Sequence, residues 1–131
     1  MKNIILILSS FFLFSCSDIY QPAVVSARKE ASQIGLEIMK NGGNAYDAMI
    51  AVHLALAVVH PTAGNIGGGG FFVYSDSDGT SGSLDFREMA PGNAYKDMYL
   101  DQNGDVIPDM STLGGAAVGV PGSISAIFEI H

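Results

Sequence analysis

The sequence has 131 residues, of which 48% are hydrophobic and 15% are charged. This composition is typical of one folded domain and unlike that of disordered chains, which combine low hydrophobicity with high charge. Six Lys and Arg residues against thirteen Asp and Glu residues give a net charge of −7. The charge argues against a nucleic-acid partner, because such binding requires cationic side chains that neutralise phosphates. The single cysteine excludes an internal disulfide framework, and the spacing of the three histidines matches no metal site, so we expect neither a metal nor another cofactor.

Residues 1–16 are predicted to be an export signal. Lys2 precedes an apolar run at 4–14 that is too short to span a membrane as a helix. The run ends in LFSC at 13–16, which resembles the lipobox of bacterial lipoproteins, where the cysteine becomes the lipid-modified first residue. We therefore expect an exported, periplasmic or cell-envelope protein of a bacterium, anchored in the membrane through lipid on Cys16. Ordinary secretion and a buried strand with a free thiol are the alternatives.

The predicted folded part comprises residues 25–131, after a short polar tether at 17–24. Apolar residues recur at helical spacing over 26–41, with Ser26 as the expected N-cap and NGG at 41–43 as the stop. A second helix is predicted over 45–59, where Asn44 and Asp47 have the spacing of a capping box. This second helix is apolar on nearly every side, so we expect it to be buried on most sides.

A hairpin is predicted after the second helix. The segment 71–74 is rich in strand-forming residues, 76–79 has turn chemistry, and 83–87 alternates apolar and polar residues. These features indicate two strands with one buried face. The final residues, 123–131, begin like another helix, and the sequence ends within it.

The glycine-rich loop at 64–70, GNIGGGG, is not a phosphate-binding motif. A P-loop requires Lys followed by Ser or Thr after the last glycine, whereas Phe71 and Phe72 follow here. A dinucleotide fingerprint also fails, because the loop leads from a helix to a strand. Two interpretations stay open: a close approach between packed backbones, or backbone N–H groups that face a ligand. A calcium loop at 101–112 is disfavoured as well, because position 112 is Thr instead of Glu, and a solvated turn is expected there.

The segment DFREMAP at 85–91 is the strongest candidate for a binding site. Arg87 is flanked by acidic residues at the end of a strand and just before a proline. Its planar guanidinium is suited to a carboxylate partner. The alternative is a structural salt bridge with Asp85 or Glu88. No complete catalytic set can be assembled from this sequence, because none of its threonines stands in a context that marks a nucleophile.

Four blocks together resemble the start of the large subunit of γ-glutamyltranspeptidases, also called glutathione hydrolases. The blocks are NGGNAYDA at 41–48, AVVHP with GNIGGGGF at 57–71, DFREMAP at 85–91 and AVGVPG at 117–122. They occur in the family's order and extend over nearly all of the chain after the signal.

The resemblance implies an α+β fold, the αββα sandwich of N-terminal-nucleophile hydrolases, with only its leading segment present in 25–131. In such enzymes a precursor cleaves itself into a large and a small subunit and exposes a threonine nucleophile. That threonine forms an acyl-enzyme from a γ-glutamyl compound such as glutathione, which water or an acceptor amino acid resolves. The family's arginine in this block binds the α-carboxylate of the γ-glutamyl group, a role that the match assigns to Arg87, with Glu88 or Asp85 orienting it.

The resemblance also implies that the threonine block lies beyond this sequence. The chain alone is therefore expected to be inactive without the rest of the large subunit and the small subunit. The alternative function is that of a degenerate, non-catalytic lipoprotein that keeps a carboxylate-binding surface.

Overall fold

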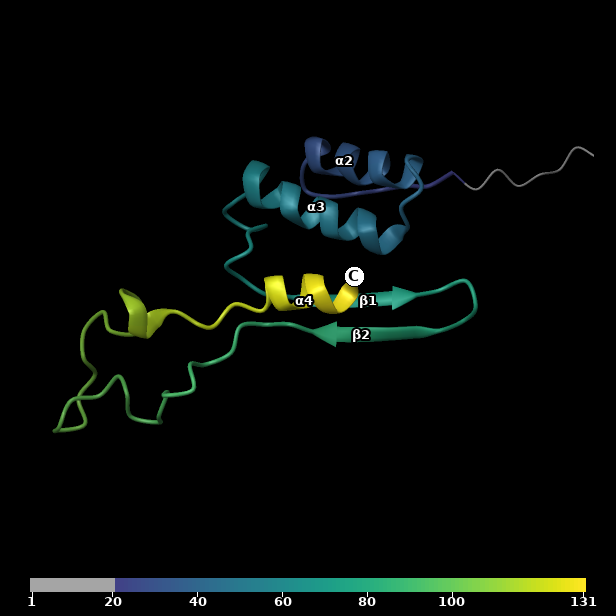
Figure 1. The fold of residues 1–131 in the computed structure, drawn as a ribbon. Helices are drawn as coiled ribbons and strands as arrows, with labels where there is room; N and C mark the ends of the chain where they lie inside the picture. The colour runs from purple at the N-terminus through teal and green to yellow at the C-terminus, as the bar shows by residue number, and fades with distance from the viewer. Residues whose placement is uncertain (1–20) are drawn as a thin grey trace, which may run out of the picture.

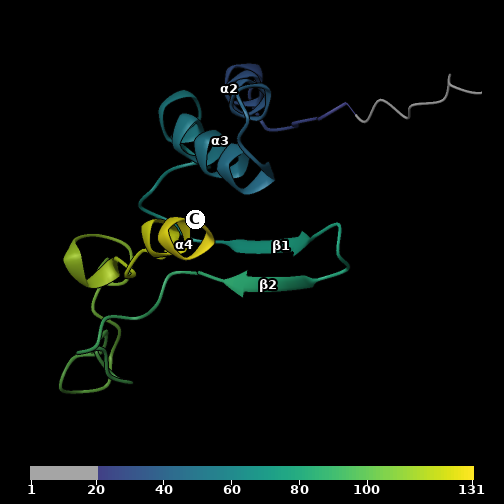
Figure 2. The same cartoon turned by 45° about the vertical axis from the view of Figure 1, so that its right-hand side comes forward.

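The computed structural model describes residues 21–131, and the predicted signal peptide and Cys16 lie outside this range. The described part is an α+β fragment with three α-helices and one two-stranded antiparallel sheet (Figure 1). Its elements are α2 (Lys29–Lys40), α3 (Ala45–Val59), β1 (Phe71–Ser75), β2 (Ser81–Asp85), a short 3-10 helix η2 (Gly115–Ala117) and α4 (Ser123–Ile130). The helix pair α2–α3 lies on one side of the hairpin, and α4 lies near the hairpin end that is remote from its turn (Figures 1 and 2).

The first helix is shorter than predicted at its N-terminus. It begins at Lys29, with Arg28 at the cap position and no side-chain cap. The expected cap, Ser26, donates instead to the Arg28 carbonyl and shares a hydrogen bond with the Ser32 hydroxyl. The prediction of Ser26 as the N-cap is therefore wrong, because its hydroxyl donates to the carbonyl of Arg28 in the turn before the helix. The predicted stop is confirmed: Asn41 caps the helix, and Gly42 follows with a left-handed φ of 98°.

The second helix has its predicted bounds and its predicted capping box. The Asn44 side chain accepts from the Asp47 backbone N–H at 2.9 Å, and the Asp47 carboxylate accepts from the Asn44 N–H at 2.9 Å. The helix packs on α2 where small residues meet: a β-carbon on Gly35 would lie 2.6 Å from Val52 Cγ2 and 3.3 Å from the Ala48 carbonyl oxygen. Close approach at Gly35 and Ala48 therefore joins the two helices.

The hairpin pairs Phe71 with Asp85 and Ser75 with Ser81. The second strand thus runs over Ser81–Asp85 and not over the predicted 83–87. The turn explains the shift: Asp76 N–H donates to the Thr80 carbonyl at 2.7 Å and Gly79 has a φ of 89°, which brings Ser81 directly into register. As predicted, one face is more buried than the other, with residues 72, 74, 82 and 84 half-buried and their neighbours exposed.

An irregular segment links β2 to α4 and extends away from the rest of the molecule (Figure 1). Within it, the Asp101 carboxylate accepts from the N–H groups of Asp105 at 3.0 Å and Asn103 at 2.8 Å. These bonds favour the ionised carboxylate and lower the pKa of Asp101 below its usual value. The expected turn at 101–105 is confirmed. No group of three His, Cys, Asp or Glu side chains within 21–131 is arranged to hold a metal ion.

The hydrophobic core is small. Among the described residues, the buried apolar side chains are three alanines, Ala31, Ala48 and Ala126. The expectation that 45–59 is buried on most sides is wrong for this structure, since Ala48 is the buried residue of α3 and Val58 is 79% exposed. The physical reason is that the segments packed against α3 within 21–131, which include α2 and the hairpin, leave much of its surface uncovered. None of the described helices combines the length and the apolar character needed to cross a membrane.

Candidate substrate-binding site

The backbone around Arg87 is held between two segments that are distant in sequence. Residues 86–89, here called the arginine strap, directly follow β2. Phe86 N–H donates to the Gly70 carbonyl at 3.0 Å, which attaches the strap to the glycine-rich loop. Met89 and Val120 exchange two backbone hydrogen bonds, of 3.1 and 2.8 Å, which attach its other end to the segment before α4. Arg87 and Glu88 are therefore carried on backbone that is fixed at both ends.

The Arg87 side chain is exposed and contacts an aromatic ring. Its guanidinium carbon lies 5.9 Å from the centre of the Phe71 ring, a cation–π geometry, and Phe71 is 67% exposed. The Asp85 carboxylate accepts from the Arg87 backbone N–H at 3.0 Å. Asp85 therefore holds the backbone of Arg87, while the exposed guanidinium packs over Phe71.

Glu88 faces the glycine-rich loop. A β-carbon built on Gly68 would lie 3.3 Å from Glu88 Oε1, and one built on Gly119 would lie 3.1 Å from Glu88 Cβ. The two predicted site residues are therefore adjacent on one strap, with Glu88 packed between the two glycine-rich segments.

A cavity of about 300 Å³ lies beside the strap. It is open to solvent, and the polar residues Arg87, Asp85, Glu129 and Ser125 are among those that line it. Met89, Val120 and Pro121 contribute apolar surface. The lining residues thus include one cationic and two acidic residues, a combination of charges that is suited to a small zwitterion.

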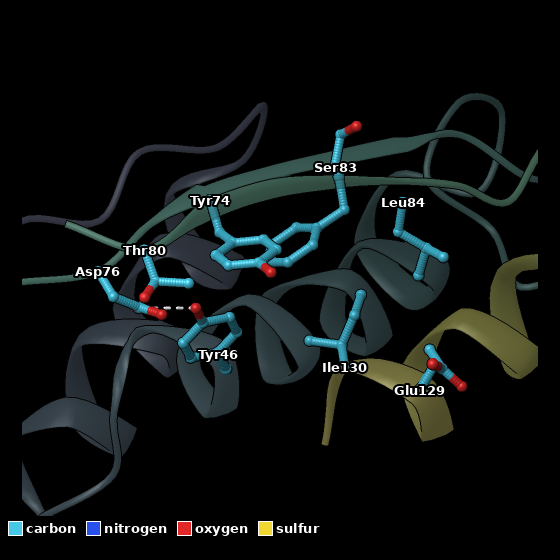
Figure 3. A pocket seen from close by; sticks show the side chains of 9 residues that line it. Tyr46, Tyr74, Asp76, Thr80, Ser83, Leu84, Glu129 and Ile130 are labelled. Carbon is cyan, nitrogen blue, oxygen red and sulfur yellow. Dashed lines mark hydrogen bonds between the residues drawn. The ribbon is translucent and has the colours of Figure 1, made fainter. Parts of the chain in front are cut away.

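A second cavity, of about 360 Å³, lies between α3, the hairpin and α4 (Figure 3). Tyr46 of α3 and Asp76 lie together at one end of it, and the Tyr46 hydroxyl donates to Asp76 at 2.7 Å, drawn as the dashed line in Figure 3. The Tyr46 ring also contacts the rings of Phe72 and Tyr74 at 5.8 and 5.9 Å between centres. These contacts join α3 to the more buried face of the hairpin.

Two buried polar atoms in the described part of the chain lack a hydrogen-bond partner, His53 Nε2 and Ser123 Oγ. His53 lies within α3. Ser123 is 1% exposed at the start of α4. Neither side chain lines the cavity beside Arg87.

Comparison with known proteins identifies a family whose matched region includes the arginine strap. Residues 31–131 match the family model described as Gamma-glutamyltranspeptidase. The chain belongs to the gamma-glutamyltranspeptidase family.

Relatives in this family cover most of the chain but are much longer. The glutathione hydrolase proenzyme of Pseudomonas sp. (strain A14) is 56% identical over 104 residues, which are 79% of this chain and 18% of that protein. The proenzyme of Escherichia coli (strain K12) is 47% identical over 105 residues, 80% of this chain and 18% of that protein. The crystal structure of Helicobacter pylori gamma-glutamyltranspeptidase matches 88% of this chain and 33% of its own chain, with 45% identity and a TM-score of 0.79. The chain therefore spans about a fifth of the length of these curated relatives.

Within this member of the gamma-glutamyltranspeptidase family, two features of the site were not predicted from sequence. One is Phe71 as the ring under the Arg87 guanidinium. The other is the pairing of Met89 with Val120, 31 positions apart. A cation–π pair depends on strand register and has no sequence signature of its own. The second glycine-rich segment, at 114–122, was the available signal for the pairing, since its glycines permit a close backbone approach.

Proposed function

We propose that this chain is the leading part of a γ-glutamyltransferase or glutathione hydrolase. In this proposal the complete protein has the αββα sandwich of N-terminal-nucleophile hydrolases and is processed from one precursor into two subunits. A threonine outside this chain attacks the γ-glutamyl amide, the amine leaves, and water or an acceptor amino acid resolves the acyl-enzyme. Support comes from the family membership and from relatives named glutathione hydrolase proenzymes.

The residue that carries this proposal within the chain is Arg87, which binds the α-carboxylate of the γ-glutamyl group. Its guanidinium lies over the Phe71 ring, its backbone N–H donates to Asp85, and the adjacent cavity is of a size that accepts an amino acid. The planar fork of arginine can donate two parallel hydrogen bonds to a carboxylate. Glu88, whose side chain lies beside Gly68 and Gly119, is a proposed neighbour of the bound substrate.

Kinetics of the complete protein test this role. We expect Arg87→Ala to lower kcat/KM for a γ-glutamyl amide by roughly 30-fold to several thousandfold. The reason is that truncating one partner of a charge pair that substrate binding partly desolvates costs about 2–5 kcal/mol. Arg87→Lys should recover only part of the loss, since an ammonium keeps the charge without the planar fork. The matched control is Arg28→Ala, which removes another exposed arginine at the start of α2.

A substrate analogue that lacks the α-carboxylate separates recognition from structure. If Arg87 binds that group, Arg87→Ala should affect the analogue much less than the natural amide. An equal loss with both substrates would assign Arg87 to a structural role, and unchanged kinetics would remove it from the site.

The same proposal includes export of the protein and attachment to the cell envelope through Cys16. The motif at 13–16 supports it, and the residue lies outside the described part of the structure. The alternative function, a non-catalytic lipoprotein with a carboxylate-binding surface, is distinguished by the gene sequence downstream of His131. An in-frame continuation with a threonine nucleophile block supports the enzyme, and a stop codon supports the alternative.

A further inference from the structure

Two glycine backbones lie against the arginine strap with no room for a side chain. A β-carbon on Gly69 would lie 2.5 Å from the Phe86 carbonyl oxygen and 2.8 Å from both Arg87 Cα and Glu88 N. A β-carbon on Gly122 would overlap the same Phe86 oxygen and lie 3.3 Å from the Arg87 carbonyl oxygen. In both cases the obstructing atoms belong to the backbone, so they cannot rotate away as the end of a flexible side chain would.

Glycine is needed at these two positions because there is no space for a β-carbon, and not because the backbone has an unusual conformation. The glycines with positive φ in the described chain are Gly42, Gly79, Gly104 and Gly114. Gly69 and Gly122 are not among them, so an alanine could adopt their backbone angles. The β-carbon of an alanine would, however, push the strap out of its present position.

The two glycine segments are also bonded to each other. The N–H groups of Gly122 and Ser123 both donate to the Gly68 carbonyl, at 3.0 and 3.1 Å. Ser123 is buried at the first turn of α4, so this junction is anchored by a helix. An added methyl group at Gly69 or Gly122 would therefore displace the strap, which carries exposed side chains. The junction between the two glycine segments would keep its place.

We propose that Gly69 and Gly122 are positioning residues that set the place and direction of Arg87. The inference rests on the proposed function, in which Arg87 binds the substrate α-carboxylate. The two glycines act through the backbone of Phe86 and Arg87, and Gly122 also lines the cavity beside Arg87. A displacement of about 1 Å in a substrate-binding group can reduce the rate about 100-fold, so a small shift of the strap has a large effect.

The test measures carboxylate selectivity in the complete protein. Selectivity is kcat/KM for a γ-glutamyl amide divided by kcat/KM for the analogue without the α-carboxylate. We expect Gly69→Ala and Gly122→Ala to lower this ratio about 100-fold. Gly92→Ala and Gly115→Ala are matched controls, because a β-carbon at either position meets nothing within 4 Å and neither has a positive φ. Both controls should keep the wild-type ratio.

A milder variant covers the case in which both main variants misfold. Gly119→Ala places a methyl group 3.1 Å from Glu88 Cβ and 3.5 Å from the Met89 carbonyl oxygen, so the strap must yield by only a few tenths of an ångström. We expect a folded protein with a smaller but measurable loss of selectivity. An unchanged ratio in the folded variants, or an equal loss with both substrates, overturns the inference.

Arg87→Ala is measured in parallel so that the two proposals can fail separately. If Arg87→Ala lowers the ratio while the glycine variants do not, the positioning role is wrong and the proposed function stands. If Arg87→Ala leaves the ratio unchanged, the proposed role of Arg87 is wrong, and the inference that depends on it falls as well.

Discussion

The Tyr46 hydroxyl donates a 2.7 Å hydrogen bond to the Asp76 carboxylate, 30 positions further along the chain. The bond connects the first turn of α3 to the turn of the hairpin, and the Tyr46 ring packs beside Phe72 and Tyr74. It raises the pKa of Tyr46 from its usual 10.0 to about 12, since ionising the phenol would break the bond and place two negative charges side by side.

This relationship predicts a pH-dependent loss of stability in alkali. Tyr46 keeps its proton in the folded chain up to about pH 12 but would lose it near pH 10 in the unfolded chain. The contribution of the pair is therefore fully present below pH 10.0 and is lost as the pH rises towards about 12. Ultraviolet titration of the tyrosines should show one late-ionising phenol, which Tyr46→Phe removes. Asp76→Asn should move that titration to lower pH, and an unchanged curve in this variant would contradict the assignment.

The second prediction concerns the activity of the 131-residue chain by itself. We expect it neither to cleave itself nor to release product from a γ-glutamyl anilide, because the proposed threonine nucleophile is in another part of the protein. The measurement is release of the anilide chromophore by the purified chain. Adding the complete protein to the same assay provides the positive control, and turnover by the chain alone would refute the prediction.

The third prediction is that the isolated chain exposes apolar surface and associates. Phe128 of α4 and Val58 of α3 are each 79% exposed, and Val73 on the outer face of β1 is 77% exposed. Large exposed apolar surfaces are sites of association. Binding of a hydrophobic fluorescent dye and light scattering should both be strong. A soluble monomer with a sharp, cooperative thermal transition would show that 21–131 forms an independent domain.

The fourth prediction tests the lipid anchor. If the motif at 13–16 directs lipid modification, cells fed a fatty-acid probe should label the wild-type protein and not Cys16→Ser. The substitution should also release the protein from the membrane fraction. Equal labelling of both proteins, or of neither, would leave ordinary secretion as the better interpretation of residues 1–16.

Local signals in the sequence were sufficient for most of the secondary structure. The capping box of Asn44 and Asp47 placed the start of α3 correctly, because a capping box depends only on neighbours within a few residues. The stop of α2 at Asn41 was also predictable from the following glycines. The start of α2 was not, since Ser26 had an alternative partner in Ser32 that no capping rule anticipates.

The sequence by itself therefore determined which segments form the helices and the hairpin, and it indicated the family. It placed Arg87 within the second strand, whereas β2 ends at Asp85 and Arg87 follows it. Tertiary structure decided what surrounds that arginine. The ring of Phe71, the pairing of Met89 with Val120 and the contacts of Gly69 and Gly122 all join segments far apart in the chain. Such contacts depend on strand register and on how closely two backbones approach, and neither is encoded within the few neighbouring residues that govern caps and turns.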